Sequence, residues 1–292
     1  MVERGGDEAQ SVARAATVQG AAGSEGYTVG ITGAPGAGKS TLTNALVTQM
    51  RLDGVELAVL AVDPSSPFTG GAILGDRVRM SDHALDPGVF IRSMATRGHL
   101  GGLGLATPGA VRLLHAAGRP WVIIETVGVG QVEVEIAGAA DTTVVVVNPG
   151  WGDAVQANKA GLLEIADVFV VNKADRPGAV DTRRDLDAML DLTNERDWRP
   201  PIVTTVAVEN RGADELWAAI RDHRAHLETS GGLEARRAAR TRDELARIVA
   251  ARVRARAEEL CGTDEFDAVQ AQVLRGELDP WTAADRVLGD QA

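Results

Sequence analysis

Short apolar runs alternate with longer amphipathic stretches along residues 27–230. Runs rich in Val, Ile and Leu that end at turn residues predict buried strands, and apolar positions at helical spacing predict helices between them. The predicted strands are Tyr27–Thr32, Leu57–Asp63, Val89–Arg92, Trp121–Glu125, Thr142–Val147, Val168–Asn172 and Pro201–Thr205, and the predicted helices are Lys39–Met50, Thr107–Ala117, Val132–Ala140, Ala154–Ile165, Asp181–Asn194 and Ala213–Glu228. This order predicts an α/β fold with a mostly parallel central sheet flanked by helices.

The pattern changes at both ends of this region. Residues 1–26 are rich in Gly, Ala and Ser and are predicted to form a flexible segment. Residues 231–292 are predicted to be helical, with a long helix over Leu233–Cys261 and shorter ones near Glu265–Arg275 and Pro280–Leu288. This C-terminal part is too small to bury a core alone, so it is expected to serve dimerisation. The domain prediction is therefore 1–26, 27–230 and 231–292.

Composition and charge limit the classes of partner. Apolar residues make up 45% of the 292 residues and aromatic residues only 3%, so Ala, Val, Leu and Ile form the core. A formal net charge of -11 argues against general binding to nucleic acid or to anionic membranes. The arginines of Leu233–Cys261 could form a nucleic-acid face, but the acidic residues between them favour a solvated or subunit-facing helix. With one cysteine, Cys261, and no long apolar segment, a soluble cytoplasmic protein is expected.

The octapeptide Gly33–Ser40 carries the strongest chemical signal, because it matches the phosphate-loop pattern of a glycine, four residues and then Gly-Lys-Ser. A strand, a glycine-rich loop and a helix follow one another, as a phosphate-binding loop requires. Its backbone N–H groups can surround an anion, Lys39 can reach the β- and γ-phosphates, and the Ser40 hydroxyl can bind Mg²⁺. The alternative is a glycine-rich turn that binds nothing. The predicted nucleotide contacts in this loop are Gly33, Ala34, Pro35, Gly36, Ala37, Gly38, Lys39, Ser40 and Thr41.

A second motif selects the base. Asn172, Lys173 and Asp175 follow the apolar run Val168–Val171 at a strand end. The Asp175 carboxylate can accept two hydrogen bonds from guanine N1–H and its 2-amino group, which adenine lacks. Alone, this motif could be an ordinary exit from a strand. On a strand that follows the phosphate loop, it predicts GTP and GDP as the ligands rather than ATP.

Three carboxylates lie where a nucleotide-bound metal needs them. Asp63 and Glu125 end predicted strands, and Asp76 follows a glycine-rich stretch. Mg²⁺ keeps several waters, so some of these acids would act through water. Glu125 and Gly128 are expected to serve the metal and the γ-phosphate respectively. Asp63 or Asp76 could instead cap a loop or pair with an arginine. The predicted Mg²⁺ set is Ser40, Asp63, Asp76 and Glu125, and the catalytic set is Lys39, Asp63, Asp76 and Glu125.

These motifs together resemble the MeaB/ArgK-type GTPases of the G3E/SIMIBI class of P-loop proteins. The resemblance rests on Gly33–Ser40, Val62–Ser66, Gly75–Met80, Arg92–Gly102 and Glu125–Gln131. It implies a homodimer held partly by C-terminal helices. It also implies GTP hydrolysis, with slow intrinsic activity, coupled to loading or protecting the cobalamin of an acyl-CoA mutase. No tightly bound cobalamin is expected on this chain itself.

The resemblance assigns roles to further residues. Pro149–Lys159 matches the family's additional switch loop, which makes Lys159 a candidate relay between the mutase and the nucleotide; it could also be a solvated helix lysine. Val206, Ala207 and Val208 stand where the family has Ser-Ala-Leu near guanine O6. Val206 lacks the serine hydroxyl, but the Ala207 N–H can still serve O6, so guanine preference is expected to persist.

Two other functions compete with this prediction. Sequences of this type have been described as ATPases or kinases of amino-acid (arginine/ornithine) transport, but Asp175 argues against ATP and no acceptor-site motif is present. A nickel-insertion GTPase normally needs a His- or Cys-rich site. Five scattered His and one Cys do not supply one.

Overall fold

The computed structural model describes residues 26–63, 80–95, 106–126, 135–150, 161, 163–192 and 197–289. Asp76, Gly128 and Lys159 lie outside these residues, as does the side chain of Asp63. Their predicted roles remain predictions.

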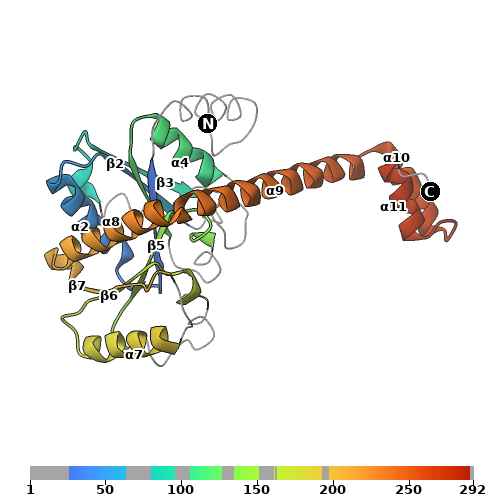
Figure 1. Ribbon diagram of the computed structural model, residues 1–292. Coiled ribbons are helices and arrows are strands. Elements are labelled where there is room, and N and C mark those ends of the chain that lie inside the picture. Colours follow the sequence, from blue (N-terminus) through green and yellow to red (C-terminus); the bar gives the residue numbers. More distant parts are fainter. Residues whose placement is uncertain are drawn as a thin grey trace. The chain divides into compact units, whose positions relative to one another are not determined.

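Seven parallel strands form one sheet in the order β3-β2-β4-β1-β5-β6-β7 (Figure 1). Since every neighbouring pair is parallel, all carboxyl ends lie at one edge of the sheet. The predicted fold class is confirmed. The strands are β1 (Tyr27–Gly33), β2 (Leu57–Asp63), β3 (Val89–Ala95), β4 (Trp121–Thr126), β5 (Thr142–Val147), β6 (Val168–Asn172) and β7 (Ile202–Thr205).

Helices cover both faces of this sheet because successive side chains of a strand point to opposite faces. Val144 and Val146 of β5 pack in one buried cluster with α2 (Lys39–Leu52) and α8 (Ala213–Ser230). Val145 and Val147 pack on the other face with α7 (Ala179–Leu192). On that same second face, α4 (Ala106–Ala116) covers β2 and β4. The core is therefore two apolar layers that enclose the sheet.

One predicted helix is wrong in its C-terminal half. Residues 136–139 form a turn, although the sequence pattern predicts a helix over Val132–Ala140. The Ile136 side chain is fully buried and lies against Gly30, where a Cβ atom would come within 2.7 Å of Ile136 Cγ1. Packing on this glycine, together with the low helix propensity of Gly138, outweighs the helical pattern. Of the helix predicted over Ala154–Ile165, the described residues 161 and 163–165 are helical.

The chain divides into two compact units, one that ends at Arg240 and one that begins at Thr241. Gly231, in a left-handed conformation, separates α8 from α9 (Gly232–Cys261). The shorter helices are α10 (Asp264–Leu274) and α11 (Pro280–Leu288), capped by the side chains of Thr263 and Asp279. All three helices agree closely with the predicted ones. Among the described residues, no helix has both the length and the apolar character needed to span a bilayer.

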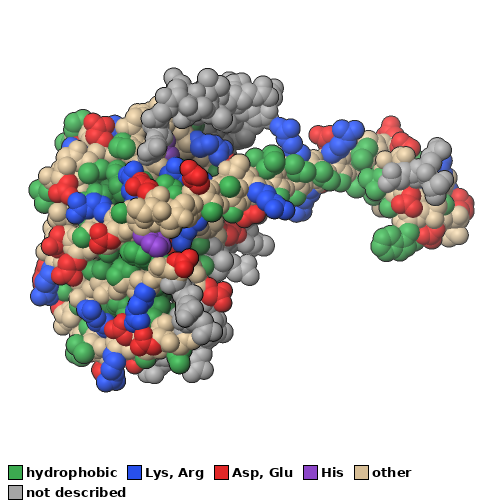
Figure 2. Space-filling view, viewed as in Figure 1, with side chains coloured by type: hydrophobic (Ala, Val, Ile, Leu, Met, Phe, Trp, Pro, Cys, Tyr) green, Lys and Arg blue, Asp and Glu red, His purple; other side chains and the backbone are tan. Residues whose placement is uncertain are grey.

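The second unit leaves apolar surface uncovered. Leu245, Val249 and Val253 of α9 are 62%, 52% and 65% exposed, and hydrophobic side chains at the surface of this helix are visible in Figure 2. An apolar cavity of about 330 Å³ opens between the end of α9 and the helices α10 and α11, lined by Leu260, Val269 and other side chains. The helices of this unit therefore do not bury their own apolar faces completely.

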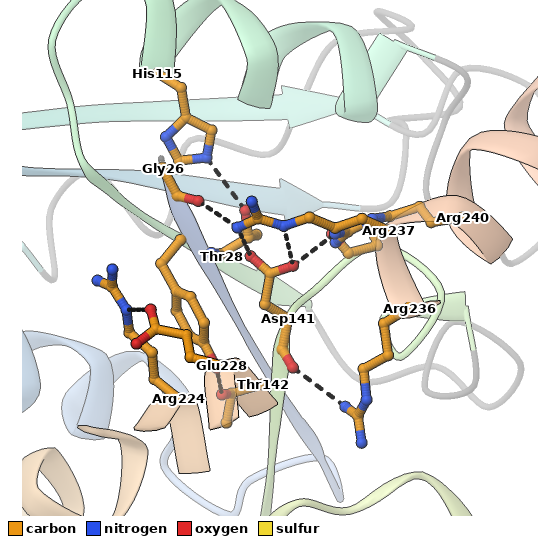
Figure 3. Close-up of polar contacts among 12 residues, drawn as sticks. Gly26, Thr28, His115, Asp141, Thr142, Arg224, Glu228, Arg236, Arg237 and Arg240 are labelled. Carbon is orange, nitrogen blue, oxygen red and sulfur yellow. Dashed lines mark hydrogen bonds and ion pairs between the residues drawn. The ribbon is translucent and has the colours of Figure 1, made fainter. Parts of the chain in front are cut away.

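A buried carboxylate holds the amino edge of the sheet in the first unit. Asp141 is 2% exposed, accepts the Thr28 N–H at 2.9 Å, and pairs with Arg237 at 3.2 Å and Arg240 at 2.6 Å (Figure 3). Burial alone would raise the pKa of Asp141, but the guanidinium groups of Arg240 and Arg237 outweigh it and keep this pKa below its usual value. These arginines of α9 thus bind carboxylates of the same chain.

Candidate functional site

The loop after β1 has the backbone conformation of a phosphate cradle. Gly33, Gly36 and Gly38 have φ values of 132°, 72° and 91°, which side chains rarely permit. A Cβ atom on Gly33 would lie 2.0 Å from the Val146 carbonyl oxygen, and one on Gly38 would lie 2.5 Å from Asn172 Nδ2. Glycine is therefore required here by both conformation and space. Gly38 offers no side chain to cap α2, so the first N–H groups of that helix are left for an anion.

Lys39 and Ser40 begin α2 beneath this loop. The Lys39 ammonium donates to the carbonyl oxygens of Gly33 at 2.7 Å and Ala34 at 3.1 Å, which holds it across the cradle. The Ser40 hydroxyl donates to Glu125 Oε1 at 2.5 Å. Glu125 comes from the end of β4, pairs in register with Ile31 of β1, and is 1% exposed. The structure therefore brings together the phosphate-binding lysine, the hydroxyl and the strand-end acid that the sequence predicts.

Asn172 joins the phosphate loop to the loop after β7. Its amide Nδ2 donates to the Ala37 carbonyl oxygen at 2.8 Å. Its Oδ1 accepts hydrogen bonds from the Thr205 hydroxyl at 3.0 Å and from the Ala207 N–H at 3.2 Å. Asn172 is 2% exposed, so these bonds satisfy a buried amide. One side chain thus fixes the distance between the phosphate loop and the predicted base loop.

Two residues close after Asn172, Lys173 and Asp175, are also predicted to contact the nucleotide. Lys173, with a φ of 58°, crosses back and donates to the Gly36 carbonyl oxygen at 2.6 Å. The Asp175 side chain is exposed at the same edge of the sheet. The positive φ of Lys173 turns the chain sharply after β6, which brings its ammonium over the phosphate loop.

The base loop after β7 is compact. Val206 is 2% exposed, and its N–H and carbonyl form an antiparallel bridge with Arg211. The short helix η3 (Ala207–Glu209) lies within this bridge. Ala207 N–H, predicted to serve guanine O6, points to Asn172 Oδ1, and Val208 is 80% exposed. Val206 is thus a buried apolar residue at the position where the resemblance to the family implies a serine.

All these groups lie at the carboxyl edge, around β1. The chain order reverses there, because β4 is on one side of β1 and β5 on the other. Open parallel sheets bind ligands at such a switch point. A phosphate cradle, a buried acid and an Asn-Lys-x-Asp segment at this point have the arrangement of a guanine-nucleotide site.

A comparison with protein-family models agrees with this arrangement. The model described as Methylmalonyl Co-A mutase-associated GTPase MeaB matches residues 1–261. This chain belongs to the MeaB family of GTPases. It is therefore a GTP hydrolase that binds guanine nucleotides, as its motifs predict.

Several known proteins are similar to this MeaB-family chain in sequence or fold. A protein from Pyrococcus abyssi that carries a GTPase name is 52% identical over 266 residues, covering 90% of this chain and 82% of that protein. The mouse protein named methylmalonic aciduria type A homolog, mitochondrial, is 34% identical over 268 residues, covering 90% of this chain and 65% of the relative. The crystal structure of LAO/AO transport system kinase has a TM-score of 0.68 and 28% identity, covering 94% and 85% of the two chains.

Sequence reasoning missed two hydroxyl contacts of this MeaB-family site. Thr205 supports Asn172, as described above, and the Thr126 hydroxyl donates to the Thr32 hydroxyl at 3.2 Å between β4 and β1. Thr205 immediately precedes Val206, so a search for hydroxyl donors beside the base loop could have found it. Thr32 and Thr126 carry no local signal, because their contact depends on the order of the strands.

Proposed function

We propose that this MeaB-family GTPase hydrolyses GTP slowly by itself and serves as a chaperone that loads or protects the cobalamin of an acyl-CoA mutase. The observation that best supports a guanine-nucleotide site is that the Asn172 side chain bonds both the phosphate loop and the loop after β7. Two names support the mutase role. The family description includes association with methylmalonyl Co-A mutase, and the mouse relative is named for methylmalonic aciduria.

The residues of the site suit Mg²⁺. The Ser40 hydroxyl and the Glu125 carboxylate lie 2.5 Å apart in a buried position, and both are oxygen donors of the kind that Mg²⁺ prefers. We propose that they hold the ion directly or through water, with Asp63 and Asp76 as further donors. When bound, Mg²⁺ neutralises charge on the β- and γ-phosphates.

The chain itself supplies positioning and charge for phosphoryl transfer. We propose that Lys39 and the N–H groups of the loop from Gly33 to Thr41 stabilise the transferred phosphoryl group. Asp63 or Asp76 orients the attacking water, and the Gly128 N–H contacts the γ-phosphate. Lys159 relays contact with the mutase to this site.

The guanine base is proposed to lie between Asp175 and the base loop. Asp175 accepts hydrogen bonds from N1–H and the 2-amino group, and the Ala207 N–H turns from Asn172 to O6. The Thr205 hydroxyl keeps its bond to Asn172 Oδ1, so the tie between the two loops remains. Val206 and Val208 flank that N–H. Val206 supplies no hydroxyl to orient Asp175, so discrimination depends on the Asp175 carboxylate itself.

Replacing Asp175 with asparagine should therefore weaken GTP binding and reverse the base preference. The loss of a charged acceptor for two donors is expected to raise the Kd for GTP by on the order of 10²-fold. Xanthosine triphosphate carries a 2-oxo group that can accept a hydrogen bond from the new amide, so its Kd should fall. Fluorescence titration of both nucleotides against both proteins measures this.

A transport-associated kinase is the second candidate, because the solved structure with 28% identity carries that title. Such an enzyme would use ATP and would need no guanine contact. The same titration, with ATP as a third nucleotide, separates the two candidates. Tighter binding of ATP than GTP by the unaltered protein would favour the kinase.

The mutase role predicts that a partner stimulates hydrolysis. Adding a purified cobalamin-dependent acyl-CoA mutase should raise kcat for GTP, since docking would order the loops around the γ-phosphate. Phosphate release is measured with and without each mutase, and serum albumin is the protein control. An unchanged kcat with methylmalonyl-CoA, isobutyryl-CoA, 2-hydroxyisobutyryl-CoA and ethylmalonyl-CoA mutases would contradict the role.

We also propose that the chain forms a homodimer through its C-terminal helices. The exposed Leu245, Val249 and Val253 and the apolar cavity beside α10 and α11 support this, because such surface favours association. A single-chain mass in light scattering would contradict it. Cytoplasmic location and the lack of nucleic-acid or membrane partners remain predictions from the sequence.

A further inference from the structure

Two buried aspartates hold the amino ends of three neighbouring strands. Asp141 immediately precedes β5. Its N–H donates to the Thr28 carbonyl oxygen of β1 at 2.7 Å, and its carboxylate accepts the Thr28 N–H at 2.9 Å. Asp167 precedes β6 and bonds Thr143 of β5 in the same way, at 2.9 and 2.8 Å. Each aspartate therefore forms two hydrogen bonds with the neighbouring strand of the sheet. These bonds fix the relative positions of the strand ends.

Three arginines in the first turns of α9, here called the arginine clamp (Arg236, Arg237 and Arg240), bind these aspartates. Figure 3 shows the three arginines around Asp141. Arg236 donates to both carboxylate oxygens of Asp167 at 2.7 and 2.8 Å and to the Asp141 carbonyl oxygen at 3.1 Å. It therefore bridges the two aspartates. Arg237 and Arg240 bind the Asp141 carboxylate.

Arginine, not histidine, supplies the positive charge for Asp167. His223 is fully buried, with Nε2 3.3 Å from Asp167 Oδ1 and Nδ1 2.8 Å from the Thr142 hydroxyl. Burial lowers the pKa of His223 to about 4, although Asp167 opposes this, so the imidazole is neutral at pH 7. The fork of Arg236 is thus the cation that fixes Asp167 relative to Asp141.

The three strands held in this way carry the nucleotide site at their other ends. β1 ends at Gly33 of the phosphate loop, and β6 ends at Asn172. β5 ends at Val147, just before the predicted switch loop Pro149–Lys159. A strand is stiff along its axis, so a change in the offset of the amino ends must appear at the carboxyl ends as a change in distance between these groups.

We propose that the arginine clamp positions the nucleotide site from the opposite edge of the sheet. By fixing Asp141 against Asp167, it sets the offset of β1, β5 and β6, and thereby the spacing between the phosphate loop and Asn172. Arg236, Arg237 and Arg240 are positioning residues that do not touch the nucleotide. The proposal needs guanine-nucleotide binding but not the mutase role.

The test compares Arg236→Gln with unaltered full-length protein. The variant loses the bridge between the aspartates, so its Kd for GDP should rise about fivefold or more, within the range found for coupled sites. The titrations are done well below the Tm of each protein, at a temperature where circular dichroism shows that both proteins are folded. Arg236→Lys keeps the charge but not the fork and should fall between the two. Arg254→Gln is the matched control, because Arg254 is exposed on the same helix and pairs with Glu258.

A second readout separates positioning from stability alone. Coupling is reciprocal, so GDP should slow hydrogen exchange at the Thr28 and Thr143 amides, which donate to the two aspartates. This effect should weaken in Arg236→Gln. A lower Tm with the GDP affinity of the unaltered protein would overturn the proposal. If Arg236→Gln does not fold, exchange in the unaltered protein and the affinity of Arg236→Lys decide, and no response in either would overturn it.

Discussion

Replacing Lys39 with alanine should slow GTP hydrolysis by on the order of 10²–10³-fold, as expected when one preorganised donor to a developing charge is removed. The Lys39 ammonium is 2.7 Å from the Gly33 carbonyl oxygen and 3.1 Å from that of Ala34, so it is held over the cradle before any nucleotide arrives. The variant would retain the N–H groups of the loop but lose the positive charge of the Lys39 ammonium. Single-turnover phosphate release measures the rate, and equilibrium titration measures GTP binding.

Lys39→Arg is the matched control for this prediction. It keeps a positive charge, but its larger planar group cannot occupy the same position between the two carbonyl oxygens, so partial activity is expected. Both variants should keep the circular dichroism spectrum and a Tm close to that of the unaltered protein. Hydrolysis by Lys39→Ala at the unaltered rate would show that Lys39 does not stabilise the transferred phosphoryl group.

Local patterns were sufficient to predict the phosphate loop and the strands. The loop from Gly33 to Ser40 has its chemistry in consecutive residues, and the fully apolar run before Asn172 identifies a buried central strand. The helix predicted to reach Ala140 failed because the packing of Ile136 on Gly30, a contact between distant residues, decides the backbone there. Periodicity in sequence contains no information about that contact.

The polar contacts that hold the site together are much harder to predict from the sequence, because they join residues that are far apart along the chain. Asn172 was predicted as a base-recognition residue, but its bonds to Ala37 and Ala207 join positions 135 and 35 residues away. The arginine clamp was missed for the same reason: Arg240 lies 99 residues from Asp141, and Arg236 lies 69 from Asp167. An aspartate before a strand has no motif of its own. Only the parallel order of the strands brings these groups to one edge.

The largest loss of stability is expected from the double variant Arg237→Met and Arg240→Met. Methionine keeps much of the apolar stem, but Asp141, which is 2% exposed, would lose both guanidinium partners; among the described residues, its carboxylate would keep the Thr28 N–H. An uncompensated buried charge costs about 3–5 kcal/mol. We expect about 3 kcal/mol, because Arg237 is 36% exposed and its pair is partly screened. Urea unfolding at pH 7 measures the loss of unfolding free energy, and Arg254→Met is the control.

The loss should depend on pH in a defined direction. In the unaltered protein the pKa of Asp141 is below its usual value, so the ion pairs stabilise the fold above pH about 4 and this contribution disappears as the pH falls through the folded-state pKa. In the double variant, Arg237 and Arg240 no longer oppose the effect of burial, and the Thr28 N–H opposes it only in part. The pKa of Asp141 should therefore rise, so the folded state gains relative stability as the pH falls and the carboxyl takes up a proton. The gap between the two proteins should therefore be largest near pH 7 and shrink toward pH 4. His223 contributes a loss of stability in both proteins over the same range, since burial lowers its pKa to about 4. A gap that stays constant from pH 7 to pH 4 would mean that the two arginines stabilise the sheet by packing and not by their charge on Asp141.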